Sequence, residues 1–181
     1  AIGTDNSGSV RIPAAFNNVY GLRPSTGLIS QNGIFPMGNL DGAPGPMART
    51  VKDLALLLDA IAQSDPNDSK TASIPRVKTY SAYLNENGLK GKRIGIVKLI
   101  GKLDPYKHTP ENIKEIFNKS IKKMQDLGAT IVDDIQLPDF DNNRKDNMAG
   151  TVDDVNAYLA SYPATRKNFQ DICDSGRTTT F

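Results

Sequence analysis

The sequence is poor in several residues that mark whole classes of protein. Its 181 residues include one cysteine, one histidine and no tryptophan. The single cysteine, Cys173, excludes a disulfide within the chain. One cysteine and one histidine, His108, are too few for the clustered ligands of a zinc site. The net charge of +2 comes from scattered basic residues, which argues against nucleic acid or a membrane surface as a partner. We predict no cofactor and no metal.

Long hydrophobic segments are also missing. The longest apolar run covers residues 54–58, far fewer than the roughly 20 residues that cross a bilayer. No secretory signal is visible, and the chain begins with Ala1 rather than with a methionine. We therefore expect residues 1–181 to be a single partial domain whose N-terminal part precedes Ala1. We assign the protein to no cellular compartment.

Glycine and proline are plentiful, with 15 and 11 residues, and they crowd into the first 50 positions. Turn signals recur there at 17–18, 23–25, 31–33, 41–42 and 44–46. So many turns indicate a layer of loops with short extended pieces, in which backbone approaches backbone closely. We interpret residues 1–50 as the loop region of an active site.

Residues 51–64 have the pattern of an amphipathic helix. Thr50 and Asp53 resemble a capping box at its start. Apolar residues then recur at helical spacing, and Leu56 widens the apolar stripe. We expect this helix to be buried on most sides.

A strand, a helix and a second strand are predicted over residues 92–135. The first strand covers 93–97 and the second covers 129–135, and Thr109 and Pro110 between them give a helix start with threonine as the N-cap. This order predicts a right-handed crossover with a parallel strand pair. The fold class is therefore α/β.

The remainder of the chain, residues 137–181, is predicted to contain a loop and short helices. The loop covers 137–150, and the helices lie near 152–161 and 163–173. We assign no function to this part.

The most informative segment is the run from Gly3 to Ile12, GTDNSGSVRI. Small residues let backbone N–H groups converge on a point without obstruction by Cβ atoms. A serine at that point, here Ser9, can act as a nucleophile, and the N–H groups can hold the oxyanion that its attack creates. Spacing alone equally allows Ser9 to be a plain turn residue. A phosphate-binding loop is excluded, because neither a Gly-Lys-Ser/Thr ending nor a Gly-x-Gly-x-x-Gly spacing is present.

This segment resembles the second half of the signature of the amidase signature family. The resemblance continues in order through VYGLRPS at 19–25, GLIS at 27–30, NGI at 32–34 and GPMARTVKD at 45–53. It is close over residues 1–62 and weaker through 89–95. Members of this family are serine hydrolases of amide bonds with a Ser–cisSer–Lys triad and no metal. The resemblance implies part of an α/β/α sandwich around a mixed β-sheet.

Matched position by position, the resemblance implies that Ser9 is the nucleophile. The backbone N–H groups implied to form the oxyanion hole are those of Asn6, Ser7, Gly8 and Ser9. The lysine and the bridging serine belong to segments that precede residue 1, so the chain alone is expected to be inactive.

Two further residues of the loop are given a bracing role by the resemblance. Asp5 and Arg11 are implied to hold the loop from either side as an ion pair. The family usually has Gly-Gly before the nucleophile, whereas this chain has Ser7-Gly8. Ser7 is tolerated if its φ is negative, and a positive φ there would strain the loop by about 1–3 kcal/mol.

The implied reaction is hydrolysis of a small-molecule or peptide amide, and the resemblance is nearest to members similar to peptide amidases. One alternative is the A-type subunit of glutamyl-tRNA amidotransferase, in which glutamine usually stands where this chain has Ile12. Another is a non-catalytic remnant or scaffold. We expect His108 to face solvent, Cys173 to pack in or near a helix, and Asp41 to be structural.

Overall fold

The computed structural model describes residues 1–36, 42–100, 102–137 and 150–176. The chain divides into two compact units, Ala1–Tyr83 with Asp146–Phe181, and Leu84–Lys145. The site predicted from the sequence lies in the first unit. Asp41 and most of the loop expected at 137–150 lie outside the described residues.

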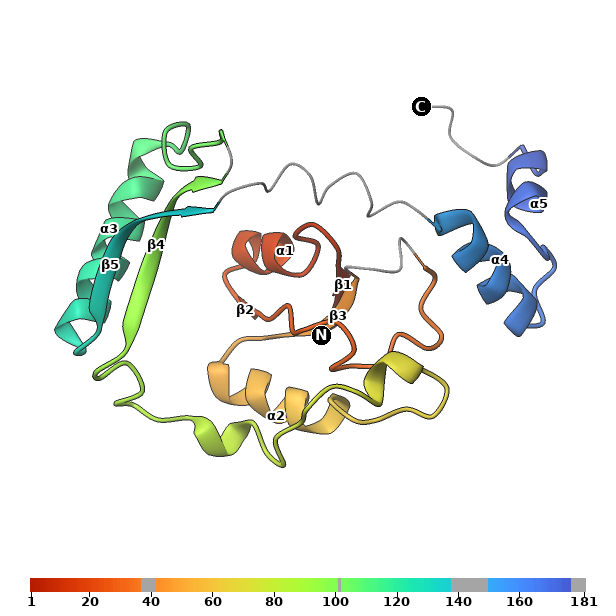
Figure 1. Cartoon of the computed structure of the whole chain (residues 1–181), viewed down its shortest axis with the longest axis horizontal. Coiled ribbons are helices and arrows are strands. Elements are labelled where there is room, and N and C mark those ends of the chain that lie inside the picture. Colours follow the sequence, from red (N-terminus) through yellow and green to blue (C-terminus); the bar gives the residue numbers. More distant parts are fainter. Residues whose placement is uncertain (37–41, 101, 138–149, 177–181) are drawn as a thin grey trace. The chain divides into compact units, whose positions relative to one another are not determined.

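The centre of the first unit is a three-stranded antiparallel sheet with the strand order β1-β3-β2 (Figure 1). Its strands are β1 (Ile2–Asp5), β2 (Tyr20–Gly21) and β3 (Ala43–Ala48). In the pairing of β1 with β3, Asp5 lies opposite Ala43 at the end of the ladder. The loop that carries Ser9 therefore begins where the sheet ends.

Strand β3 corrects one prediction, because the turn expected at 44–46 is the middle of this strand. Proline has no N–H for a ladder and is uncommon inside sheets, which is why Pro44 and Pro46 point to a turn in the sequence. Here β3 uses its carbonyls instead, and the Pro46 oxygen accepts from the Leu22 N–H at 3.1 Å. Between the prolines, a side chain at Gly45 would collide with the carbonyl oxygen of Leu22. This close approach requires glycine.

Two helices follow the strands in the first unit. Helix α1 (Arg11–Phe16) begins directly after the Ser9 loop and was not predicted, whereas α2 (Val51–Ile61) coincides with the helix expected at 51–64. The Thr50 hydroxyl oxygen accepts from the Asp53 N–H at 3.0 Å, so the cap forms as the sequence indicates. The expected burial on most sides is wrong for the described chain, because Leu56 is 48% exposed.

The apolar core of the first unit lies between α2 and the loops before it. Leu28, Ile29, Leu58 and Ala62 are buried together. Short 3-10 turns at Ser69–Thr71 and Ser81–Tyr83 follow α2, and Figure 1 shows them as short coiled ribbons along the loop after this helix. The first unit also contains α4 (Thr151–Ser161) and α5 (Phe169–Asp174), close to the helices predicted near 152–161 and 163–173.

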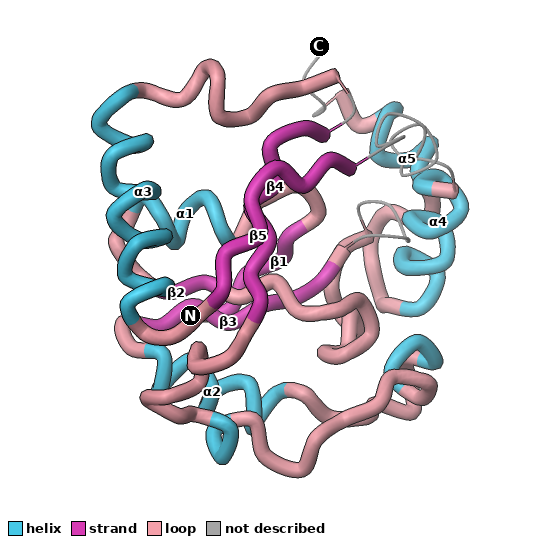
Figure 2. Tube along the Cα trace, turned by 60° about the vertical axis from the view of Figure 1, so that its left-hand side comes forward, coloured by secondary structure: helices cyan, strands magenta, loops and turns pink. Residues whose placement is uncertain are grey.

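The second unit is a strand–helix–strand arrangement. Strands β4 (Arg93–Ile100) and β5 (Thr130–Leu137) pair in parallel, with α3 (Glu111–Asp126) between them in the chain (Figure 2). The parallel pair predicted from the sequence is present, and the α/β class holds. The predicted cap is wrong, since Pro110 occupies the N-cap position and the Thr109 hydroxyl donates to the Pro105 carbonyl instead.

None of the helices in the described part of the chain is long and apolar enough to cross a membrane.

Candidate active site

Strand β1 ends in a carboxylate that organises the loop after it. The side chain of Asp5 is fully buried. Its Oδ1 accepts from the Gly8 N–H at 2.6 Å, and its Oδ2 accepts from the N–H groups of Val10 at 3.2 Å and Arg11 at 3.3 Å. The backbone from residue 6 to residue 11 is therefore wrapped around one carboxylate.

Two arginines supply the positive charge that a buried carboxylate needs. The Arg11 guanidinium donates from Nε to Oδ2 of Asp5 at 3.0 Å and from Nη2 to Oδ1 at 3.1 Å. Arg23 Nε lies 3.8 Å from Oδ1 and donates to the Asp5 carbonyl at 3.3 Å. The family motif predicts the Arg11 pair, whereas Arg23 enters the sequence argument only within a turn signal and the family run at 19–25, with no role assigned to it.

These contacts determine the protonation state of Asp5. The hydrogen bonds from Arg11 lower the pKa of the Asp5 carboxyl far below its usual range, and the backbone N–H groups of Gly8, Val10 and Arg11 lower it further, against the opposing effect of burial. The same pairing raises the pKa of Arg11. Asp5 is thus a fixed negative charge, suited to bracing rather than to proton transfer.

Ser9 lies in the turn between this carboxylate and α1, and its side chain is exposed. Within the described residues no hydrogen bond holds its hydroxyl. The residues that follow behave differently, because Val10 is fully buried and the Ile12 N–H donates to the Gly8 carbonyl at 2.7 Å to begin the helix. The fold thus anchors both sides of Ser9 and leaves its hydroxyl accessible.

The four backbone N–H groups implied for the oxyanion hole have different surroundings. The Gly8 N–H donates to the Asp5 carboxylate, so it could bind an oxyanion only by sharing or breaking this hydrogen bond. Gly8 itself has φ 128°, a conformation that other residues rarely adopt. Ser7 is not among the described non-glycine residues with positive φ, so the Ser7-Gly8 departure creates no strain of that kind.

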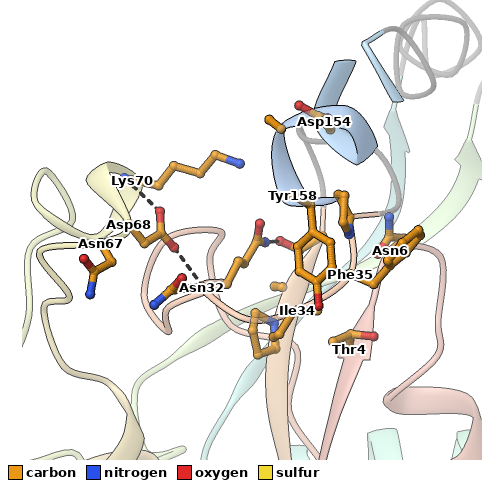
Figure 3. Close-up of a pocket in the computed structure, with 16 residues that line it drawn as sticks. Thr4, Asn6, Asn32, Ile34, Phe35, Asn67, Asp68, Lys70, Asp154 and Tyr158 are labelled. Atoms are coloured by element: carbon orange, nitrogen blue, oxygen red, sulfur yellow. Dashed lines mark hydrogen bonds between the residues drawn. The ribbon is translucent and has the colours of Figure 1, made fainter. Parts of the chain in front are cut away.

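A cavity of about 270 Å³ opens beside β1 (Figure 3). Thr4 of β1 and Asn6, which follows the strand, line it, and the buried Asp5 between them is not part of its lining. The other walls come from the loops around residues 31–36, 42–44 and 67–70 and from α4. These walls were not predicted, because no motif links segments so far apart in the sequence.

The sequence also gives expectations for His108 and Cys173. His108 is exposed, as expected. Cys173 lies in α5, but it is exposed rather than packed. In the described ranges, no group of three or more histidine, cysteine, aspartate and glutamate residues could hold a metal ion.

Comparison with known proteins gives the same family from sequence and from structure. The profile of the family described as Amidase matches residues 1–181. The A-type subunit of glutamyl-tRNA(Gln) amidotransferase from Pseudomonas savastanoi pv. phaseolicola is 42% identical over 142 residues, which cover 77% of this chain and 28% of that protein. An amidase candidate from Arthroderma benhamiae is 38% identical over 141 residues, or 77% of this chain and 23% of that protein.

Among solved structures, the native peptide amidase from Stenotrophomonas maltophilia superimposes with a TM-score of 0.87 at 32% sequence identity. The match covers 98% of this chain and 36% of that protein. The chain thus spans about a quarter to a third of the length of the relatives it matches.

Proposed function

Because the chain belongs to the amidase signature family, we propose that Ser9 is the nucleophile of a serine hydrolase that cleaves a linear amide. The observation that carries this proposal is the loop around Asp5, whose carboxylate binds three backbone N–H groups and the Arg11 guanidinium. This bracing holds an exposed serine in one place, and a held nucleophile needs less ordering when substrate binds.

The proposed reaction proceeds through an acyl-enzyme. The Ser9 Oγ attacks the amide carbonyl carbon while its proton passes to a base, and a tetrahedral oxyanion forms. The proton is returned to the leaving nitrogen, the C–N bond breaks, and ammonia or an amine departs. Water then attacks the Ser9 ester and releases the carboxylic acid. The base would be the family's lysine, acting through a bridging serine, in segments that precede residue 1.

Backbone N–H groups are proposed to hold the oxyanion. Those of Asn6, Ser7 and Ser9 lie in the loop beside the nucleophile, and that of Gly8 already donates to Asp5. Loss of one such donor typically costs about 2.7–4 kcal/mol of barrier. Backbone donors are unaffected by most side-chain changes, but distortion of the loop would remove several together.

Membership of the family also supports a proposal for the architecture of the whole domain. The chain would be part of an α/β/α sandwich around a mixed β-sheet, completed by the rest of the domain. The substrate would be a small-molecule or peptide amide, and the chain alone would not turn it over.

A second candidate is the A-type subunit of a glutamyl-tRNA amidotransferase. The 42% identity to the Pseudomonas savastanoi protein favours it. Ile12, at a position where such subunits usually have glutamine, favours the free-standing amidase, and so does the TM-score of 0.87 to the peptide amidase. Ammonia release from free glutamine, compared with release from other amides, distinguishes the two candidates.

The test is amide turnover by the full-length protein and by its Ser9→Ala variant. We expect Ser9→Ala to abolish ammonia release and Ser73→Ala, at another exposed serine, to leave it intact. Turnover that survives Ser9→Ala would remove Ser9 from the mechanism. An inactive full-length protein would favour the non-catalytic remnant.

A further inference from the structure

We propose that Arg23 is a positioning residue of the Ser9 site. Its guanidinium holds the peptide group that joins Asp5 to Asn6, where the loop leaves β1, and so fixes the direction of the Asn6 N–H. This inference rests on the proposed function, because it concerns one of the N–H groups proposed to hold the oxyanion.

Arg23 contacts both the main chain and the side chain of Asp5. Its Nε donates to the Asp5 carbonyl oxygen at 3.3 Å and lies 3.8 Å from the carboxylate Oδ1. The Arg23 side chain is 27% exposed, against 54% for Arg11, so it is the more buried of the two arginines beside Asp5. Because water screens it less, its charge acts more strongly on the groups that it contacts.

The contact with the Asp5 carbonyl bears on the next N–H because of the geometry of the peptide bond. The Asp5 C=O and the Asn6 N–H belong to one planar trans peptide group, in which they point in opposite directions. A donor that fixes the carbonyl therefore fixes the N–H as well. The cation also polarises the peptide group, which makes the Asn6 N–H a stronger donor. Arg23 thus acts on the oxyanion through Asn6, without touching substrate.

The other anchors of the loop act further along it. The Asp5 carboxylate binds N–H groups between residues 8 and 11, and Arg11 binds that carboxylate. Pairing of β1 with β3 reaches Asp5 but not Asn6. Arg23 therefore supports the loop at the point where the sheet stops supporting it.

The backbone of Arg23 is held on both sides of this residue. The preceding Leu22 N–H donates to the Pro46 carbonyl of β3 at 3.1 Å, and the Leu22 carbonyl lies against Gly45. The following Pro24 is buried and restricts Arg23 to extended conformations. Less conformational freedom is therefore lost when the side chain makes its contact.

The two arginines differ in how they bind Asp5. Arg11 places two nitrogens on the two carboxylate oxygens, a fork that lysine cannot reproduce. Arg23 contacts the Asp5 carbonyl through Nε, and a lysine ammonium is also a charged donor. Lysine should therefore replace Arg23 much better than it replaces Arg11.

The test measures kcat and KM of the full-length protein for the amide used in the Ser9 experiment, with kcat expressed per folded protein from urea denaturation. We expect Arg23→Met to lower kcat about tenfold or more and to change KM less than about twofold, because an oxyanion donor acts in the transition state. Arg23→Lys should recover most of the rate. Arg93→Met, at an exposed arginine, should keep all of it.

The outcomes separate this inference from the proposed function. If Ser9→Ala is inactive but Arg23→Met loses only stability, with kcat per folded protein unchanged, the positioning role is wrong and the nucleophile stands. A rise in KM alone, or an Arg23→Lys variant as slow as Arg23→Met, would overturn the role in the same way. If Ser9→Ala still releases ammonia, or the unsubstituted protein releases none, the proposed function fails and the role of Arg23 fails with it.

Discussion

The guanidinium of Arg11 holds the carboxylate of Asp5 at two points, 3.0 Å from Nε to Oδ2 and 3.1 Å from Nη2 to Oδ1. Asp5 is fully buried, whereas the Arg11 side chain is 54% exposed. The pair joins the end of β1 to the start of α1, and Ser9 lies in the loop that it closes. The stability of this loop and the position of the nucleophile therefore depend on the same contacts.

Asp5→Asn is expected to destabilise the full-length protein by about 3 kcal/mol, because it removes one partner of a buried ion pair and leaves Arg11 and Arg23 without their counter-charge. Asp53→Asn, at an exposed carboxylate in the first turn of α2, is the matched control and should cost below about 1 kcal/mol. Urea denaturation measures both variants. If the two variants lost the same free energy of unfolding, the Asp5–Arg11 pair would contribute no more to stability than an exposed carboxylate does.

The effect of Asp5 on stability should depend on pH. Because its pKa is lowered in the folded state from about 3.9 in the unfolded chain, the carboxylate stabilises the fold above about pH 4. This stabilisation is lost as the pH falls below the unfolded value toward the lowered folded one. The difference in unfolding free energy between the unsubstituted protein and Asp5→Asn should be constant from pH 5 to 8 and shrink below pH 4. A difference that stays constant down to pH 3 would contradict the lowered pKa.

Arg11→Ala is expected to lower kcat by about tenfold or more with little change in KM, since Arg11 positions the loop without touching substrate. Arg11→Lys should recover only part of the rate, because lysine cannot bind both carboxylate oxygens in the same fork. Steady-state kinetics on one amide substrate measure both. Arg93→Ala, at an exposed arginine, is the control, and a similar rate for Arg11→Ala and Arg93→Ala would refute the positioning role.

Gly8→Ala should disturb the loop directly. At φ 128° a side chain is strained, and its Cβ would lie 2.6 Å from Ile12 Cδ1. We expect a loss of about 1–3 kcal/mol in stability and a large loss of activity. Gly91→Ala is the matched control, because Gly91 also has positive φ but a Cβ added there would have no described atom within 4 Å. Activity should survive Gly91→Ala, and its loss in both variants would mean that the strain at Gly8 is not specific to the site.

The strongly periodic elements could be predicted from the sequence. The capped helix α2 and the β4–α3–β5 order have local signals, namely a capping box and alternating strand and helix patterns. Strand β3 could not be predicted, because Pro44 and Pro46 suppress a strand signal and the segment forms a strand through its pairing with β1 and β2. Helix α1 is six residues long, too short to show a period.

The candidate site, like the fold, could be predicted only in part from the sequence. The loop from Asp5 to Arg11 is a contiguous motif, so its residues could be named from sequence. The second cation, Arg23, and the cavity walls on α4 come from separate segments brought together by the fold. No local pattern carries that information.

The most direct test of the central claim is to map the residue that an active-site-directed fluorophosphonate modifies in the full-length protein. The reagent forms a phosphonyl ester with an activated serine and releases fluoride. Peptide mass spectrometry should place the adduct on Ser9, and Ser9→Ala should take up no reagent. An adduct on any other serine, or equal labelling of the unsubstituted protein and Ser9→Ala, would contradict the account.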